Sequence, residues 1–596
     1  MPRPYEVSAH SVKVISRRTR SSGTGPVALP GIPVATQWAN KTRIHRTDEA
    51  VLLIQSDFRI DINRPQLVLH GGTPNGGRVR VRLTVVVSSL IAALLPLSPV
   101  AAGTGEQGRD GPTPSVTWTP CAGDPTADCG TLAVPIDWAR PRGATIDLAL
   151  VRRKATDPAA RVGSLVVNPG GPGGSGVDAV LERVLTFSPE ITRRFDLVGF
   201  DPRGVARSHP VVCSAALAYQ APDPLALRSQ ADFAALVAYN QRLREDCRAR
   251  TGPLADHVDT LSVVRDLDAI RAALGDEKLT YYGVSYGTLI GQLYAERFPG
   301  RVRALALDSN MDHSLGTGAF LDTETATVQD SFDEFVSWCD RTEACALHGK
   351  DVRALWAGLI ARADRGELPF PGDPSIFLNR TSLLSLVFGA FYGPAWSQLA
   401  DALVALDTGT RPSVSSLVEP RRQEDDVVEN PAQVFCEDYL VPVRDFREYA
   451  AHLDRATRIA PDMRISPLAI SMIAACLGQP TPIPNPQHQL RVAPNAQVLL
   501  GNAVHDPATP YSWAASTARQ IGRAGVLLTY EGWGHGIYGR GDCTTGAFDR
   551  YLVSRTLPAR GTRCPAVPPA EATLRRAPWP VPSGPVPGLP GWRFRS

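Results

Sequence analysis

Residues 279–288, LTYYGVSYGT, contain a G-x-S-x-G motif centred on Ser285. The β-rich run LTYY precedes the motif, and a helical pattern over 289–298 follows it. A strand–turn–helix of this kind holds a serine in a strained turn, so the residues two positions away must be small, as Gly283 and Gly287 are. The alternative is a glycine-rich turn whose serine only caps the helix. The flanking patterns favour a nucleophilic serine at position 285.

Outward from the motif, short β-rich runs alternate with helical patterns from about 115 to 310. Residues 260–274 have apolar residues at helical spacing, with Thr260 as the expected N-cap and Gly275 as the stop. This alternation predicts a largely parallel sheet with packed helices. The strands are expected at 145–151, 164–167, 195–200, 279–282 and 304–307.

Residues 315–485 have a mostly helical pattern, as at 352–363 and 383–406, and a polar stretch at 419–429 is expected to be a solvated loop. Strand signals return afterwards. A helical block inserted between two halves of an α/β sheet predicts a cap over an active site. The later strands are expected at 497–500 and 525–530, and the organisation is a sheet core at 103–314 and 486–565, a cap at 315–485 and a Pro-rich, loosely packed or disordered tail at 566–596.

The strongest targeting signal is the uncharged apolar run LTVVVSSLIAALLPL at 83–97, which follows three closely spaced arginines and precedes small residues. This is the order of a secretory signal peptide, and the run is short for a membrane span. A buried helix is the alternative, but Pro96 and Pro99 disfavour it. We therefore expect a signal peptide at 78–102 that is cleaved after Ala102, and no stable membrane span after cleavage.

Residues 1–77 show no sustained hydrophobic period, and a signal peptide does not normally lie so far inside a chain. The hypothesis is a start codon assigned too early, with initiation at Val79 or Val81. Residues 1–102 carry an excess of basic side chains, so the net charge of +3 for the whole chain becomes about −5 without them. A mildly acidic protein of this kind has no electrostatic footprint for nucleic acid.

All ten cysteines lie after the expected signal peptide. An even number confined to an exported segment favours disulfides, and pairing of sequence neighbours is the simplest hypothesis, although sequence does not determine connectivity. A metal site is disfavoured because no C-x-x-C or H-x-x-x-H spacing occurs. The cysteines are Cys121, Cys129, Cys213, Cys247, Cys339, Cys345, Cys436, Cys476, Cys543 and Cys564.

A serine nucleophile needs a base and an acid, and both are expected after late strands. His535, in EGWGHG, directly follows the last strong strand signal, and the small residues around it would let its loop reach Ser285. Asp506, in NAVHDPATP, follows the preceding strand and lies 29 residues before His535. Asp308, after an earlier strand, is the alternative acid.

An oxyanion needs two backbone N–H donors directed at one point. The amide of Tyr286, next to the nucleophile, is the first candidate. The glycine-rich loop NPGGPGGSG at 168–176 follows a strand and offers the amide of Gly171 as the second. A phosphate-binding loop is the alternative, but no Lys-Ser/Thr ending is present and the prolines remove donors.

Five motifs together resemble the secreted tripeptidyl aminopeptidases, in the prolyl-aminopeptidase group of α/β-hydrolases, over roughly residues 110–565. The order Ser, Asp, His along the chain is also that of α/β-hydrolases. The resemblance implies the α/β-hydrolase fold and an exported peptidase that removes short peptides from free N-termini without a cofactor. The motifs are NPGGPGGSG at 168–176, DPRGVARS at 201–208, GVSYGT at 283–288, DPATP at 506–510 and GWGH at 532–535.

An exopeptidase must recognise a free α-ammonium, which requires a carboxylate in the cleft. The segment QVFCED at 433–438 resembles the cap segment of the family, in which a Cys is followed two residues later by Asp. Glu437 is a departure from that pattern, so either Glu437 or Asp438 could receive the ammonium, held by a disulfide at Cys436. The alternative is a surface acidic pair.

The triad alone does not separate peptides from esters, since both undergo acyl transfer. An exported carboxylesterase of the same fold is therefore the main rival to the aminopeptidase. A non-catalytic binding homologue is the second rival, disfavoured because all three triad positions are chemically intact. Peptides with free N-termini are the expected partners.

Overall fold

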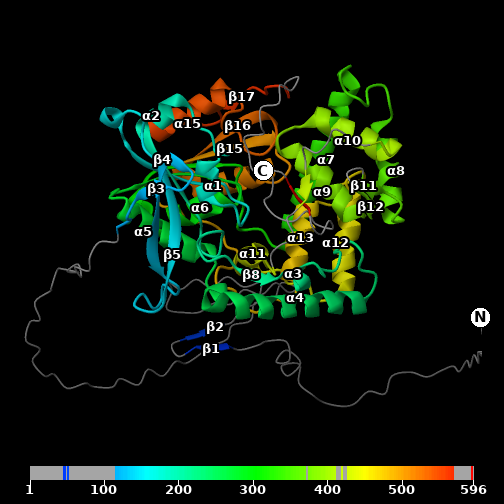
Figure 1. Ribbon diagram of the computed structural model, residues 1–596, viewed down its shortest axis with the longest axis horizontal. Coiled ribbons are helices and arrows are strands. Elements are labelled where there is room, and N and C mark those ends of the chain that lie inside the picture. The colour runs from blue at the N-terminus through cyan, green and yellow to red at the C-terminus, as the bar shows by residue number, and fades with distance from the viewer. Residues whose placement is uncertain are drawn as a thin grey trace, which may run out of the picture. The chain divides into compact units, whose positions relative to one another are not determined.

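The computed structural model describes residues 115–370, 373–410 and 426–569, and the backbone of four short strands outside these ranges (Figure 1). The chain divides into two compact units, Met1–Gln107 and Gly108–Ser596. In the first unit, β1 (His45–Thr47) and β2 (Ala50–Leu52) pair antiparallel. The expected signal peptide at 78–102, most of 1–77 and most of the tail at 566–596 lie outside the described residues.

The second unit is built on a sheet of ten strands. Every pair from β17 to β7 is parallel, whereas β7–β5, β5–β4 and β4–β3 are antiparallel. This is the mostly parallel sheet expected from the sequence. The order is β17 (Arg563–Cys564), β16 (Gly525–Trp533), β15 (Val498–His505), β10 (Val302–Asp308), β9 (Leu279–Val284), β6 (Gly163–Asn168), β7 (Phe195–Phe200), β5 (Thr145–Arg153), β4 (Asp124–Pro135) and β3 (Thr119–Cys121).

The central strands are buried on both faces, which is why they read as apolar runs and not as alternating patterns. Successive side chains point to opposite faces of a strand. In β9, Tyr281 belongs to one hydrophobic core and Tyr282 to the other, and in β10 Leu305 and Ala306 divide in the same way. The strands β3 and β4 were not predicted, because DPTADCGTLAVP mixes polar and apolar residues without a regular alternation and contains two prolines.

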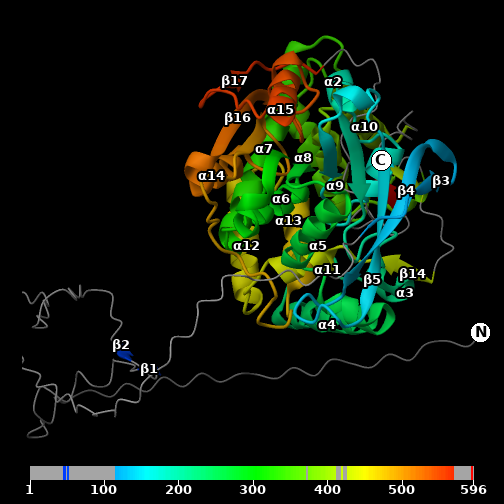
Figure 2. The same cartoon turned by 90° about the vertical axis from the view of Figure 1, so that its left-hand side faces the viewer.

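Helices cover both faces of this sheet (Figure 2). The first core includes residues of α5 (Thr260–Ala273), α6 (Tyr286–Arg297) and α14 (Tyr511–Ile521). The second includes residues of α1 (Gly176–Leu181), α2 (Pro189–Arg194) and α15 (Asp542–Ser554). The predicted N-cap of α5 was wrong by one residue, because Asp259 accepts the hydrogen bond from the Ser262 amide while Thr260 is the first helical residue.

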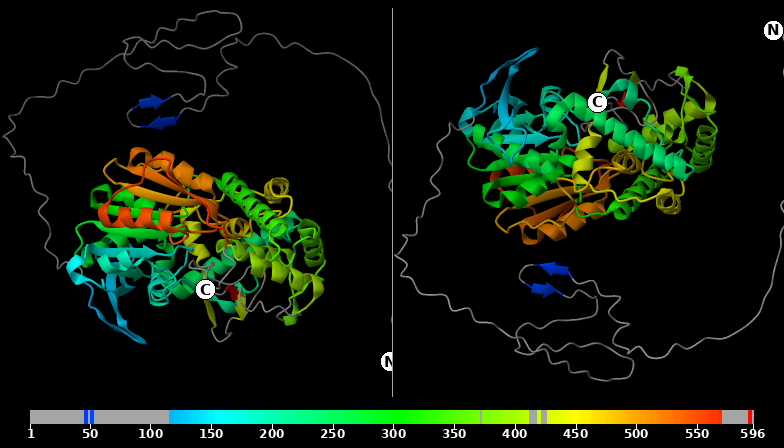
Figure 3. Two further views of the ribbon diagram at one scale, coloured as in Figure 1. Left: turned by 90° about the horizontal axis from the view of Figure 1, so that it is seen from above. Right: turned by 90° about the horizontal axis from the view of Figure 1, so that it is seen from below.

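Among the described residues, seven helices lie between β10 and β15 in the sequence, and they gather beside the sheet (Figures 1 and 3). The helix α4 (Gln230–Thr251) runs along their base, where the Asn240 side chain donates to carbonyls of Ala474 and Leu477 at 2.8 and 3.1 Å. The inserted helices are α7 (Thr317–Arg341), α8 (Val352–Asp364), α9 (Arg380–Tyr392), α10 (Trp396–Thr408), α11 (Ala432–Asp438), α12 (Phe446–Ile459) and α13 (Pro467–Cys476).

Two sequence predictions for this segment were wrong. The helix expected over 383–406 is two helices, α9 and α10, because Gly393 and Pro394 interrupt it and proline has no amide hydrogen to donate. The solvated loop expected over 419–429 ends in a strand. In the second unit, the short strands that pair outside the large sheet are β8 (Val212–Ser214) with β14 (Val427–Glu429), β11 (Pro369–Phe370) with β12 (Asp373–Phe377), and β13 (Val418–Pro420) with β18 (Trp592–Phe594). The short helix α3 (Ala215–Ala218) directly follows β8.

All ten cysteines are paired in five disulfides, and each joins neighbours in sequence, as the simplest hypothesis proposed. Within the described ranges, no helix has the length and apolar character needed to cross a bilayer. The disulfides are Cys121–Cys129, Cys213–Cys247, Cys339–Cys345, Cys436–Cys476 and Cys543–Cys564.

Candidate active site

Ser285 stands at the tight turn between β9 and α6, with φ 57° and ψ −126°. This left-handed conformation is unfavourable for a residue with a Cβ atom, and such strain gathers at functional sites. A Cβ on Gly283 would lie 2.4 Å from the Gly287 carbonyl oxygen, and one on Gly287 would lie 2.8 Å from the Asn168 oxygens. Both motif glycines are therefore needed, because a side chain at either position would collide with backbone atoms that lie close to it.

The glycine-rich loop after β6 lies against this turn. A Cβ on Gly170 would lie 2.9 Å from the Tyr286 amide nitrogen, so the loop and the start of α6 are in direct contact. The amide of Gly170 donates to the Asn168 side chain at 2.9 Å, whereas that of Gly171 donates to no acceptor among the described residues. As the first residue of α6, Tyr286 has no carbonyl one turn earlier to receive its amide. The amides of Gly171 and Tyr286 are thus available donors at this place.

The DPRGVARS motif supports the glycine-rich loop from behind. Asp201 accepts from the hydroxyl of Ser175 at 2.5 Å and the amide of Val177 at 3.1 Å, which anchors the start of α1. Arg203 is fully buried and forms two hydrogen bonds of 2.6 Å with Asp266 of α5. The motif holds the loop, the sheet and α5 together, and the side chains of Asp201 and Arg203 are both occupied by these contacts.

His535 and Asp506 form a buried pair at the carboxyl ends of β16 and β15. The His535 Nδ1 atom lies 2.9 and 3.1 Å from the two carboxylate oxygens of Asp506. The Nε2 atom has no hydrogen-bond partner in the described part of the chain, so the structure records no hydrogen bond between His535 and the Ser285 hydroxyl. The pair that the sequence predicts as base and acid is therefore in contact.

Asp506 remains ionised although it is fully buried. Burial alone would raise the pKa of Asp506, but the charge of His535 and hydrogen bonds from His535, Ser309 and the Thr509 amide outweigh it, and the pKa is lowered. The Thr509 hydroxyl also donates to Asp506 at 3.0 Å and lies 3.4 Å from the His535 Nδ1 atom. A negative charge beside the imidazole stabilises its protonated form and orients the ring.

Asp308, the alternative acid, holds the histidine loop by other contacts. Its carboxylate accepts from the Ile537 amide at 2.8 Å, the Tyr538 amide at 2.9 Å and the Tyr282 hydroxyl at 2.9 Å. Burial raises the pKa of Asp308 to about 6, against these hydrogen bonds. Its backbone carbonyl accepts from the Ser285 amide at 3.0 Å, so Asp308 links the turn at the serine to the loop at the histidine.

The inserted helices contribute two contacts to this site. Tyr392, at the end of α9, packs edge-on against the His535 ring with 4.9 Å between ring centroids, and its carbonyl accepts from the His535 amide at 2.9 Å. Asp438, at the end of α11, accepts a very short hydrogen bond from the Tyr286 hydroxyl. The insertion therefore contacts His535 and the residue that follows Ser285.

Asp438 and Glu437 are both buried and both surrounded by protein donors. Asp438 also accepts from the Thr260 amide at 2.9 Å, the Thr260 hydroxyl at 2.5 Å and the Asn485 side chain at 2.6 Å. Glu437 accepts from the Val258 amide at 2.9 Å and, more weakly, from Gln433 at 3.3 Å. These residues are not a surface acidic pair.

Three contacting residues were not identified from the sequence. Ser309 and Thr509 bond to Asp506, and both stand within three residues of candidates already identified, so their proximity to strand ends was the available signal. Tyr392 lies 143 residues before His535 and carries no such signal. No cluster of potential metal ligands occurs in the described ranges.

In chemical terms, the site offers a strained serine, an imidazole held by a buried carboxylate, and two free amides. This combination is suited to attack on a carbonyl with an acyl-enzyme intermediate. The groups come from the carboxyl ends of neighbouring strands, which is where ligands bind in open α/β sheets.

Comparisons with known proteins agree with this geometry. A family model described as alpha/beta hydrolase fold matches residues 163–372, and one described as TAP-like protein matches residues 462–564. The serine protease Hip1 of Mycobacterium tuberculosis (strain ATCC 25618 / H37Rv) is 33% identical over 481 residues, covering 75% of this chain and 91% of that protein. Carboxylesterase B of the same strain is 32% identical over 508 residues, covering 80% and 96%. Tripeptidyl aminopeptidase of Streptomyces lividans is 30% identical over 477 residues, covering 75% and 86%.

Proposed function

Because the chain belongs to the tripeptidyl aminopeptidase-like family of α/β-hydrolases and is a serine hydrolase, we propose that it is an exported aminopeptidase acting through Ser285, His535 and Asp506. Its substrates would be peptides with free N-termini, from which it releases short peptides. The observation that carries the proposed triad is the buried pair of His535 and Asp506. The Nε2 atom of His535 is unpaired within the described residues. Asp308 accepts hydrogen bonds both from the loop that follows His535 and from the backbone amide of Ser285.

In the proposed mechanism, the Nε2 atom of His535 takes the hydroxyl proton as Ser285 attacks the scissile carbonyl. Asp506 stabilises the imidazolium through its bond to Nδ1. The amides of Gly171 and Tyr286 stabilise the oxyanion, and loss of one such donor typically lowers kcat on the order of a hundredfold or more. His535 then gives the proton to the leaving amine, and water releases the acyl group through the same base.

The inserted segment at 315–485 is proposed to be a cap over this site. Tyr392 on His535 and Asp438 on Tyr286 support this, since both contacts come from inserted helices. A cap that encloses a peptide end would explain release of short peptides in preference to internal cleavage. The carboxylate that receives the ammonium was expected at Glu437 or Asp438, and that expectation stays a prediction.

Export is proposed from the disulfides and from the sequence at 78–102. Five disulfides in one protein are typical of oxidising compartments outside the cytosol. The location follows from this proposal as extracellular or cell-envelope associated.

A panel of chromogenic substrates tests the function. Tripeptidyl anilides with free N-termini should be cleaved with a kcat/KM well above that of their N-acetylated forms, and Ser285→Ala should abolish both activities while the fold is retained. Hydrolysis of short-chain esters alone would refute the peptidase proposal.

A carboxylesterase is the second candidate, favoured by the similarity to carboxylesterase B over 80% of this chain. Ester turnover without cleavage of free or blocked peptides would support it. Absence of any turnover, together with no labelling of Ser285 by a fluorophosphonate, would instead indicate a binding protein that has kept the fold.

A further inference from the structure

Arg540, five residues after His535, is a partly buried arginine whose guanidinium bonds to no carboxylate in the described ranges. Burial lowers the pKa of Arg540, against the charges of Tyr530, Asp308 and Asp506, which lie too far away to pair with it directly. Withdrawing a charged group from water is costly unless its donors are bonded. The place of Arg540 beside the site therefore needs an explanation.

The Arg540 guanidinium directs its donors at backbone carbonyls of two separate segments. Its Nε atom donates to the Gly536 carbonyl at 3.0 Å, and its Nη2 atom donates to the His535 carbonyl at 3.2 Å. The same Nη2 atom donates to the Tyr392 carbonyl at 2.9 Å. Because the donors of arginine form a rigid planar fork, one guanidinium that binds three carbonyls fixes their relative positions. A single side chain thus joins the His535 loop to the last residue of α9.

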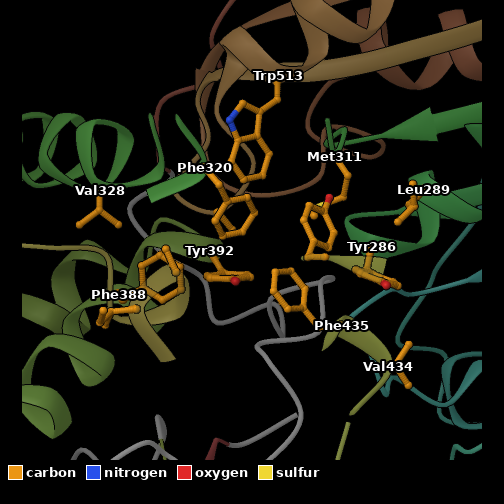
Figure 4. Packing of buried hydrophobic residues seen from close by; sticks show 14 of the residues in the cluster. Tyr286, Leu289, Met311, Phe320, Val328, Phe388, Tyr392, Val434, Phe435 and Trp513 are labelled. Atoms are coloured by element: carbon orange, nitrogen blue, oxygen red, sulfur yellow. The ribbon is translucent and has the colours of Figure 1, made fainter. Parts of the chain in front are cut away.

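The Tyr392 carbonyl lies at the carboxyl end of α9, where a helix leaves carbonyls unpaired. The last four carbonyls of a helix have no intrahelical partner, and this end carries a partial negative charge that favours a cation. The His535 amide, at 2.9 Å, and Arg540 supply donors to this carbonyl. The Tyr392 ring lies among the buried aromatic side chains (Figure 4), and Phe388 packs against it at 5.3 Å between centroids. The helix end is therefore a fixed support for the His535 loop.

The backbone around His535 depends on contacts from outside the loop. Gly534 and Gly536 flank His535 with φ of 94° and 79°, and glycine loses more conformational freedom on folding than any other residue. The amides that follow His535 donate to side chains at the end of β10. The carbonyls of His535 and Gly536 accept from Arg540. The donors and the acceptors of the loop are thus held from different sides.

Gly534 shows how closely the guanidinium approaches the loop. A Cβ at position 534 would lie 2.7 Å from the Arg540 Nη2 atom and 2.7 Å from the Tyr392 carbonyl oxygen. A side chain there would push the guanidinium and the end of α9 apart. The glycine that precedes the histidine is therefore required by the same contact.

We infer that Arg540 is a positioning residue of this hydrolase: its guanidinium holds the His535 loop against the carboxyl end of α9 and keeps the imidazole against the Tyr392 ring. The inference rests on the proposed role of His535 as the base. Arg540 acts on the reaction only through the backbone of His535. Its loss should therefore lower kcat and leave KM nearly unchanged.

The test compares Arg540→Ala with the wild type on a free tripeptidyl anilide and on a short-chain ester. On each substrate that the wild type hydrolyses, kcat should fall on the order of 10- to 100-fold, because a displacement of about 1 Å in a catalytic group has effects of this size. KM should stay within about twofold, since a positioning residue does not bind the substrate.

Arg303→Ala is the matched control. Arg303 is also partly buried, and its guanidinium donates to the carbonyls of Leu552 and Val553 at 2.7 and 2.8 Å. It lies near the amino end of β10, whereas the site lies at the carboxyl end. Loss of Arg303 should leave kcat unchanged on both substrates.

Chemical rescue adds a readout that a general loss of stability would not produce. Guanidinium chloride at millimolar concentrations, well below those that unfold proteins, should restore part of kcat in Arg540→Ala by taking the place of the missing side chain. Sodium chloride at the same concentration should not restore it, and guanidinium should not raise kcat of Arg303→Ala. Arg540→Lys is the second variant should Arg540→Ala not fold, and its kcat should stay well below the wild type because an ammonium lacks the planar fork.

A wild-type kcat in Arg540→Ala or Arg540→Lys would overturn the inference. An equal loss of kcat in Arg303→Ala, or a loss in Arg540→Ala that guanidinium does not reverse, would also overturn it, since the effect would then be one of general stability. An active His535→Ala enzyme would refute the proposed triad itself. An inactive His535→Ala enzyme beside a fully active Arg540→Ala enzyme would refute this inference alone, which separates the two failures.

Discussion

The Ser309 hydroxyl donates a hydrogen bond of 2.6 Å to the Oδ2 atom of Asp506. The same hydroxyl accepts from the Gly536 amide at 2.7 Å, directly after His535. Ser309, directly after strand β10, therefore joins the carboxylate and the histidine loop of the proposed triad. A buried carboxylate needs such donors to stay ionised.

Replacing Ser309 with alanine should lower kcat about 10- to 100-fold with little change in KM, because a hydrogen bond to a charged group contributes roughly 1.5–3 kcal/mol. Steady-state kinetics on the free tripeptidyl anilide measure this. Ser554→Ala, at an exposed helix end, is the control and should leave both constants unchanged. A Ser309→Ala enzyme with wild-type kcat would show that Asp506 does not depend on this donor.

The two buried aspartates at the site should differ in their effects. Asp506→Asn should reduce kcat by about four orders of magnitude, because the amide cannot hold the imidazole in the required state. Asp308→Asn should act mainly on stability, since Asp308 bonds to the amides of Ile537 and Tyr538 and not to the imidazole. Parallel measurements of kcat and melting temperature distinguish them. The reverse order of effects on kcat would identify Asp308 as the acid.

Removing the Tyr286 hydroxyl should destabilise the protein through Asp438. In Tyr286→Phe, the buried Asp438 loses one of its donors, which typically costs about 1–3 kcal/mol of unfolding free energy. Urea unfolding followed by fluorescence measures the change. Equal stability of Tyr286→Phe and the wild type would contradict a structural bond at this position.

Asp438 should also make stability depend on pH. Burial, followed by the charge of Asp259, raises the pKa of Asp438 to about 7, above the ordinary value of 3.8. Between these values the folded protein binds more protons at this carboxyl than the unfolded chain does, so its contribution to stability falls as pH rises from about 4 to 7. Melting temperatures from pH 4 to 8 should show a smaller decline for Asp438→Asn than for the wild type. Identical slopes would exclude this carboxyl as the cause.

The disulfide between Cys436 and Cys476 should support the end of α11, where Asp438 stands. It closes a loop of 40 residues, and its removal should cost up to about 4 kcal/mol of unfolding free energy. The double variant Cys436→Ser/Cys476→Ser, compared by urea unfolding with Cys339→Ser/Cys345→Ser, measures this. The shorter loop of the second pair should give the smaller loss, and the opposite ranking would argue against the loop-closure account.

The core of the fold could be predicted from local patterns. Strands β6, β7, β9 and β10 are mostly apolar and almost fully buried because both faces of the sheet are covered, and each was expected close to its observed position. The length of a helix is harder to predict from a local pattern. Residues 383–406 have the pattern of one helix, but Gly393 and Pro394 divide them between α9 and α10. The edge strand β3 and its neighbour β4 were missed because several of their residues are exposed to solvent and polar.

By itself, the sequence determined the type of each central element and the residues at the strand ends, including Ser285, Asp506 and His535. In a parallel sheet these ends meet at one edge, so position in the chain is enough to place them together. Only the tertiary structure decided that Tyr392 covers His535, that Asp438 bonds to Tyr286, and that Arg540 bonds to the Tyr392 carbonyl. Such contacts join residues up to 152 positions apart. They depend on how separate helices pack against one another, and helix packing cannot be predicted from the hydrophobic periodicity of a short segment.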